Sequence, residues 1–302
     1  MHEGSRRAII AAFAANIGIA AAKFLGFAFT GSASMLAEAV HSVADTGNQG
    51  LLLFGSKRAV REATPEHPFG FGRERYFWSF VVALVLFTLG GAFALVEGVD
   101  KLRHPHAAES LWWAVIVLAV AIGLESFSFK TAVRAANVER GRTPWLRFLQ
   151  MAKSPELPVL LLEDSGALVG LTCALVGVIM SKVTGNARWD AVGSLAIGLL
   201  LCAIAAFLAI EMKGLLIGES ATSQMEELIV AAIRTAPRVR RIIHLRTEHL
   251  GPDEVLLAAK VEFDHDLTVT ELADAINGAE ALVRAQVPEA RIIYIEPDIF
   301  RG

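Results

Sequence analysis

Six stretches of the chain are apolar over the length that a membrane-spanning helix needs. Crossing the hydrocarbon core takes about 20 mostly apolar residues, and the stretches cover residues 8–29, 32–54, 76–99, 111–129, 157–183 and 189–212. Of the 302 residues, 54% are hydrophobic and 20% are charged, which is a membrane composition. The pattern therefore predicts an α-helical membrane protein with six transmembrane helices in a domain of residues 1–212.

From Lys213 onward the chain becomes more polar, and its apolar residues are spaced in short segments. Helical and strand-like apolar spacings alternate there, and Gly251-Pro252-Asp253 is typical of a turn between two strands. The order α-β-β-α-β predicts a small α+β domain over residues 213–302, cytosolic and small enough to favour a partner. The expected helices are 223–236 and 269–286, and the expected strands are 239–247, 254–263 and 290–295.

Lysine and arginine are distributed unevenly over the segments that join the spans. Residues 6–7, 57–75 and 134–153 hold twelve of them, whereas 101–103 and 182–188 on the opposite side hold four. By the positive-inside rule, we expect both termini in the cytoplasm. The first apolar run has span length and no clear cleavage site, so it indicates a helix rather than a signal peptide. Compact loops favour a bacterial inner membrane.

Ionisable side chains interrupt the second and fifth spans. His41 and Asp45 are four residues apart and share a helical face, and Asn48 continues that stripe. Glu163 and Asp164 lie in the fifth span. A charge at the bilayer centre costs about 2.5–3.5 kcal/mol on insertion scales, so these groups predict function. Imidazole and carboxylate suit divalent metals. If the two spans pack together, His41, Asp45 and Asp164 can meet at one metal ion, with Glu163 or Asn48 as the fourth ligand.

Polar groups in a span can instead serve only to join helices by hydrogen bonds. That interpretation is preferred for Asn16, and pairing with Lys130 is preferred for Glu125. Cys173 and Cys202 lie in apolar runs and are expected to be buried hydrophobes. A net charge of −3 without basic motifs argues against a nucleic-acid partner. No protease or His-Glu-x-x-His arrangement occurs in the sequence, so neither an enzyme nor a resident cofactor is expected.

Several segments, in this order, resemble the cation diffusion facilitator family of proton-coupled zinc and divalent-metal transporters. The resemblance runs from Asn16 to Pro297 and is strongest to the branch that includes the vertebrate mitochondrial zinc transporter. The segments that carry it are GSASMLAEAVHSVADTGNQ, HPFGFGRERYFW, LLLEDSGALVGL, GNARWDAVGSLAIG, IIHLRT and IIYIEP.

The resemblance implies a proton-coupled antiporter that exports divalent metal, with Zn²⁺ favoured, through a midplane site between the second and fifth spans. It also implies a homodimer joined through both domains, the cytosolic one ferredoxin-like. The transport ligands then fall on His41 and Asp45, and on Asp164 and Leu160. Leucine cannot bind metal, so Glu163 is the expected substitute, and a harder site would also admit Mn²⁺, Fe²⁺ or Co²⁺. The alternative is a non-transporting metal-binding or scaffold membrane protein.

The family's accessory metal sites look incomplete in this sequence. The cytosolic zinc ligands fall on Lys260, Tyr294 and Glu296, and the loop before the third span offers His67 with Phe71 where a second histidine is usual. The sequence therefore predicts no histidine cluster in the cytosolic domain.

Overall fold

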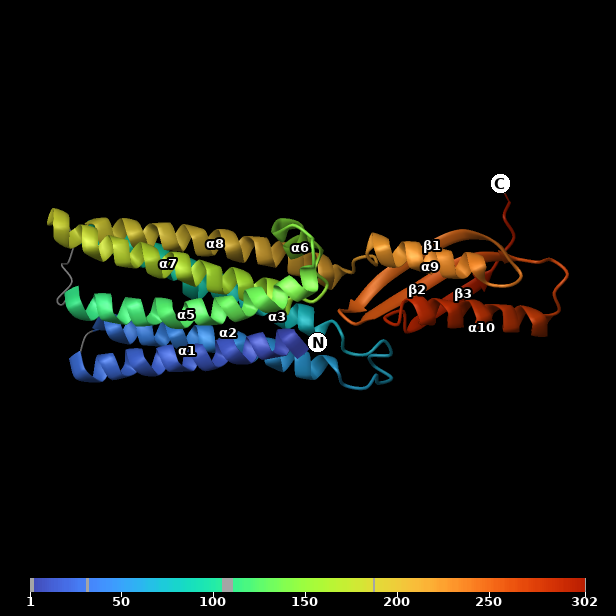
Figure 1. Cartoon of the computed structure of the whole chain (residues 1–302), viewed down its shortest axis with the longest axis horizontal. Helices are drawn as coiled ribbons and strands as arrows, with labels where there is room; N and C mark the ends of the chain where they lie inside the picture. The colour runs from blue at the N-terminus through green and yellow to red at the C-terminus, as the bar shows by residue number, and fades with distance from the viewer. Residues whose placement is uncertain (1–2, 31–32, 105–110, 187, 302) are drawn as a thin grey trace. The chain divides into compact units, whose positions relative to one another are not determined.

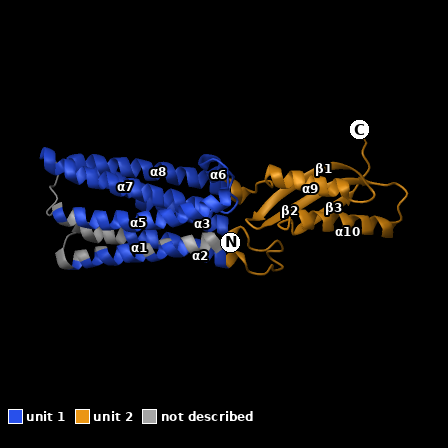
Figure 2. Ribbon diagram, viewed as in Figure 1, with its two compact units in different colours: residues 1–57, 75–213 blue, residues 58–74, 214–302 orange. Residues whose placement is uncertain are grey.

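A computed structural model describes residues 3–30, 33–104, 111–186 and 188–301, and it leaves undescribed the side chains of 3–8, 33–41 and some nearby helical positions. The chain forms two compact units. Unit 1 comprises residues 1–57 and 75–213, and unit 2 comprises residues 58–74 and 214–302 (Figure 2).

Unit 1 is a bundle of long helices that lie side by side (Figure 1). Each of the six predicted spans corresponds to a helical run, so the predicted membrane fold is confirmed. Among the described residues, four runs are long and apolar enough to cross a membrane: Glu74–Arg103, Val115–Arg140, Glu156–Thr184 and Arg188–Ile217. The helices are α1 (Glu3–Thr30), α2 (Ala33–Ala59), α3 (Glu74–Val85), η1 (Leu86–Ala92), α4 (Phe93–Arg103), α5 (Leu111–Arg140), α6 (Trp145–Met151), α7 (Glu156–Thr184) and α8 (Arg188–Ile217).

The third span differs from the continuous α-helix that its hydropathy predicts. Its middle, η1, is a π-helix, and it separates α3 from α4. Gly90 and Gly91 lie in this segment, and a Cβ atom on Gly91 would be 2.5 Å from the Cys202 Sγ atom of α8. The glycines therefore allow a close approach of two backbones at the point where the helix widens. Such π segments are frequent at functional sites.

Only one of the two ends of unit 1 is connected along the chain to unit 2. At one end α1, α3 and α7 begin while α2, α5 and α8 end, and from here the chain continues into residues 58–74 and 214–302 (Figure 1). We call this the domain end and the opposite one the far end.

Unit 2 has the predicted order α-β-β-α-β. Strand β1 pairs antiparallel with β2, and β2 pairs parallel with β3, so the sheet order is β1-β2-β3. Thr268 and Glu271 form a capping box that begins the second helix, since each side chain accepts the other's backbone N–H. The elements are α9 (Ser223–Thr235), β1 (Val239–Gly251), β2 (Glu254–Phe263), α10 (Val269–Gln286) and β3 (Ile292–Pro297).

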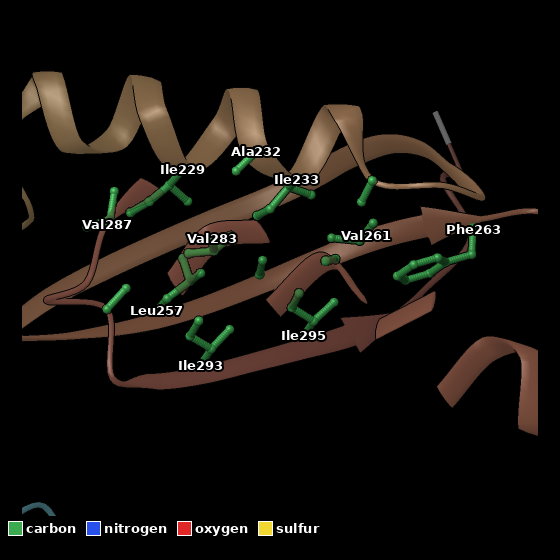
Figure 3. Close-up of a cluster of buried hydrophobic side chains, with 14 residues drawn as sticks. Ile229, Ala232, Ile233, Leu257, Val261, Phe263, Val283, Val287, Ile293 and Ile295 are labelled. Atoms are coloured by element: carbon green, nitrogen blue, oxygen red, sulfur yellow. The ribbon is translucent and has the colours of Figure 1, made fainter. Parts of the chain in front are cut away.

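One apolar core holds unit 2 together (Figure 3). Alternate residues of β2, from Val255 to Phe263, are buried, as a strand with one covered face requires. Leu257 and Val261 of β2 meet Ile229 of α9 and Val283 of α10 in this core. The sheet and its two helices therefore form a folded domain with its own interior.

Residues 58–74, which connect α2 to α3, pack against the C-terminal part of unit 2. Arg73 forms an ion pair with Glu248 of β1. A Cβ atom on Gly72 would lie 2.7 Å from the Leu250 carbonyl oxygen and 3.0 Å from the Gly251 Cα atom, so only glycine allows this contact without rearrangement. The connection between two helices of the bundle thus belongs to the C-terminal unit.

Candidate metal centre

A layer of polar side chains lies inside the otherwise apolar bundle of unit 1. Glu163 and Asp164 of α7 are 5% and 2% exposed, although α7 is apolar along most of its length. Helix α2 contributes Asn48 and Gln49, which are also buried. Since burial of such groups is unfavourable without partners, the contacts of each one are informative.

Glu163 is held by two amides of α2. The Asn48 Nδ2 atom donates to Glu163 Oε1 at 2.7 Å, and the Gln49 Nε2 atom donates to Oε2 at 3.1 Å. Gln49 in turn accepts a hydrogen bond from Asn16 Nδ2 of α1 at 3.1 Å, which confirms that Asn16 joins helices. Both oxygens of Glu163 accept, so its carboxyl group is held in place by α2 and is linked through Gln49 to α1.

Asp164 turns toward a different helix. The Ser128 hydroxyl of α5 donates to Asp164 Oδ2 at 2.8 Å, and both residues are buried. Adjacent residues of a helix point about 100° apart, which explains why Glu163 meets α2 while Asp164 meets α5. The two acids of the pair therefore connect different neighbours of α7.

A cavity of about 130 Å³ adjoins this layer. Asp45 of α2, Glu125 of α5, and Glu163 and Asp164 of α7 all line it, together with Asn16 of α1. Four carboxyl groups around one partly open space inside an apolar bundle form an environment that attracts cations.

The predicted site residues are partly brought together. Asp45, Glu163 and Asp164 share the cavity, and Asn48 contacts Glu163, while the side chain of His41 lies outside the described residues. Among the side chains that the structure describes, no group of three His, Cys, Asp or Glu is close enough to hold one metal ion. The described carboxylates thus line the cavity without converging on one point.

Sequence reasoning missed Gln49 and gave Glu125 no part in the site. Gln49 is four residues from Asp45, so the helical stripe could have suggested it. Glu125 and Ser128 are three residues apart on α5. Glu125 lines the cavity, and Ser128 donates to Asp164. Lys130, the expected partner of Glu125, is exposed, whereas Glu125 is 6% exposed.

In unit 2, the positions at which the resemblance would place cytosolic zinc ligands carry an ion pair. Lys260 Nζ lies 3.0 Å from Glu296 Oε1 and 3.3 Å from Asp298 Oδ2, and Tyr294 is exposed. The hydrogen bonds to Glu296 and Asp298 raise the pKa of Lys260 above its ordinary value. A lysine ammonium group paired with two carboxylates therefore lies at these positions.

The polytopic bundle, its acidic cavity and the small α+β unit together define a membrane transporter fold. Residues 9–217 match the family described as "Cation efflux transmembrane domain", and residues 222–298 match "Cation efflux protein, cytoplasmic domain". The chain belongs to the cation diffusion facilitator family, whose members are transporters rather than enzymes.

Three similar proteins illustrate the range of relatives. The mouse protein named "Proton-coupled zinc antiporter SLC30A9, mitochondrial" is 34% identical over 244 residues, which cover 80% of this chain and 43% of the relative. "Metal tolerance protein C4" of Arabidopsis thaliana is 28% identical over 88% of this chain and 58% of its own length. A solved MamM-CTD variant is 23% identical over 26% of this chain and 94% of its own, with a TM-score of 0.25. The chain thus spans less than half the length of the mouse relative.

Proposed function

We propose that this protein exchanges protons for a divalent metal ion, with Zn²⁺ as the favoured cargo, and exports the metal from the cytoplasm. The observation that supports this most directly is the cavity inside the bundle, which Asp45, Glu163 and Asp164 line from two helices. The name of the mouse relative, a proton-coupled zinc antiporter, supports both the cargo and the coupling ion.

In the proposed site, His41, Asp45 and Asp164 bind the metal, and Glu163 or Asn48 supplies a fourth ligand. Metal binding requires neutral imidazole and ionised carboxylates, so it releases protons, and protons returning from the other side displace the metal. Helices α2 and α7 then expose the site to each side in turn, as in other transporters with midplane sites. Mn²⁺, Fe²⁺ and Co²⁺ are the alternative cargoes that a carboxylate-rich site admits.

We place the protein in a bacterial inner membrane as a homodimer joined through both units, with both termini cytoplasmic. The excess of lysine and arginine in residues 6–7, 57–75 and 134–153 supports this orientation. The match of residues 222–298 to a cytoplasmic domain supports the side on which unit 2 lies.

Metal flux into proteoliposomes under a pH gradient tests the proposal. Zn²⁺, Mn²⁺, Fe²⁺ and Co²⁺ are assayed separately in the wild type, Asp45→Ala, Glu163→Ala and the control Asp100→Asn, which changes an exposed acid at the end of α4. We expect Zn²⁺ flux that needs the gradient, is lost in Asp45→Ala and persists in Asp100→Asn. Loss in Glu163→Ala assigns that carboxylate to the site. A folded wild type that transports none of the metals contradicts the proposal and favours a metal-binding scaffold.

A further inference from the structure

We propose that Arg75 and Glu156 form a gate that closes the transport path at the domain end. The inference rests on the proposed transport function for its meaning, although the contacts that carry it are independent of the metal. We call Arg75, Glu156 and their partner Ser56 the gate residues.

The gate residues join three helices at one level of the bundle. Glu156, in the first turn of α7, accepts two hydrogen bonds from the guanidinium of Arg75 at the start of α3, one of them from Nη2 to Oε2 at 2.9 Å. The Ser56 hydroxyl near the end of α2 donates to Glu156 Oε1 at 3.1 Å. The side chains of Arg75 and Glu156 are only 4% and 1% exposed. This is a bidentate, desolvated ion pair.

The whole cavity lies on the far-end side of the gate residues. On α1, α2, α5 and α7, the lining residue nearest the domain end is a polar one: Asn16, Asp45, Glu125 and Glu163. The remaining lining residues of these helices, such as Ala174 of α7, lie toward the far end. We call the four polar residues the acidic layer, and the cavity extends from this layer toward the far end only.

Between the acidic layer and the gate residues the bundle is closed. Every residue of the chain from 154 to 161 is buried, so the first turns of α7 are covered on all sides. Leu157 and Leu160 pack there against Phe148 of α6 and Ala136 of α5. A metal ion that enters from the domain end must open this layer, and α7 cannot leave α2 and α3 without breaking the gate contacts.

An ion pair suits a contact that must open and close. A buried ion pair is often no more stable than apolar residues of similar volume, because both charges lose their hydration. When the domain end opens, water solvates both charges again, so the open state recovers that loss. Apolar residues at the same positions would penalise opening instead, since they would become exposed to water.

This difference gives two variants with opposite effects. Glu156→Gln leaves Arg75 buried without its counter-charge, which disfavours the closed state. Arg75→Met combined with Glu156→Leu fills the same space with apolar groups, which favours the closed state. If the ion pair only stabilised the fold, neither variant would change access to the path in a folded protein.

Access is measured with a thiol at Leu160, a fully buried residue between the gate residues and the cavity. Leu160→Cys is made in a Cys173→Ser/Cys202→Ser background, reconstituted in vesicles, and treated with a membrane-impermeant maleimide added from the domain-end side. Monodisperse elution on size exclusion shows that each variant is folded. The control Glu97→Gln removes a half-exposed pair with Lys101 near the far end of α4.

We expect Glu156→Gln to raise the labelling rate at least tenfold, the apolar double variant to lower it below the parent rate, and Glu97→Gln to leave it unchanged. Unchanged rates in both gate variants, with Zn²⁺ flux intact, overturn the gate and leave the proposed transport standing. A response of labelling in a protein without flux of any metal supports the gate and contradicts the proposed function instead.

Discussion

The two amides that hold Glu163 allow a quantitative prediction for Glu163→Gln. In the wild type each carboxylate oxygen accepts one amide hydrogen, from Asn48 and from Gln49. A glutamine keeps a single acceptor oxygen and turns an NH₂ group toward the other amide. One hydrogen bond is therefore lost, and two donors face each other in a buried place.

The size of the loss follows from the kind of bond that is broken. Hydrogen bonds to charged groups contribute about 1.5–3 kcal/mol each in water-soluble proteins, whereas those between membrane helices average about 0.6 kcal/mol. The loss of one charged bond, together with the stranded donor, gives about 2 kcal/mol between these limits. For a unit of this size, that lowers Tm by about 4–8 °C.

Tryptophan fluorescence during heating in detergent measures the effect. Adding Asn48→Asp to Glu163→Gln exchanges donor and acceptor, restores one N–H···O contact and returns one negative charge, so we expect at least half of the lost Tm to be recovered. Glu97→Gln, at a half-exposed surface pair, serves as control, since surface pairs contribute about 0–1 kcal/mol. A Tm of Glu163→Gln equal to that of the wild type, or a double variant no more stable than Glu163→Gln alone, refutes this reasoning.

Four further predictions concern other residues. Gly72→Ala should weaken the contact of residues 58–74 with β1, because its Cβ atom would meet the Leu250 carbonyl at 2.7 Å, and faster proteolysis of the loop would show it. Thr268→Ala removes the N-cap of α10 and should cost about 1 kcal/mol in denaturant unfolding. Hydrogen bonds from Thr268, first its backbone N–H and then its hydroxyl, lower the pKa of Glu271, so this carboxylate stabilises the fold above its unfolded-state pKa. The destabilisation by Glu271→Gln should therefore vanish as the pH of the unfolding assay falls through the folded-state pKa. Glu125→Gln should lower the apparent affinity for the transported metal, because it removes one carboxylate from the cavity. A higher KM for the metal in the flux assay would show it.

The sequence predicts the helices and strands better than it predicts how the helices pack against one another. The six spans and the order of unit 2 follow from hydrophobic period and length, which a bilayer and a two-layer domain constrain strongly. The role of Asn16 was also predictable, since an amide in a span needs a partner. The π-helix and the choice of Gln49 and Glu125 depend on how neighbouring helices are rotated, and single-sequence periodicity does not contain that information.

The packing of residues 58–74 against the C-terminal part of unit 2 could not be predicted from the sequence either. The segment lies between two spans and its many charges are typical of a solvated loop. The contact of Gly72 with Leu250 is made by backbone atoms, so the residue that allows it has no side chain whose chemistry could indicate a partner.

Helices α2 and α7 are joined at two levels, and in both the acceptor is a glutamate of α7. Glu156 accepts from Ser56, and seven residues further on, about 10 Å along the helix, Glu163 accepts from Asn48 and Gln49. A metal ion bound by Glu163 would occupy oxygen lone pairs that these amides now use. Metal binding would then loosen the inner contact and leave the gate residues to hold the helices together.

Zn²⁺ should therefore change access at the domain end. We expect it to raise the labelling rate of the Leu160→Cys thiol in the Cys173→Ser/Cys202→Ser parent. We expect no such effect when Glu163→Gln is added, because the amide contact is already weakened there. A control adds Asp45→Ala in place of Glu163→Gln and so removes a proposed metal ligand. A response to Zn²⁺ that remains in this variant comes from direct binding of Zn²⁺ to the thiol. An equal response to Zn²⁺ in the parent and in Glu163→Gln would show that the acidic layer and the gate open independently.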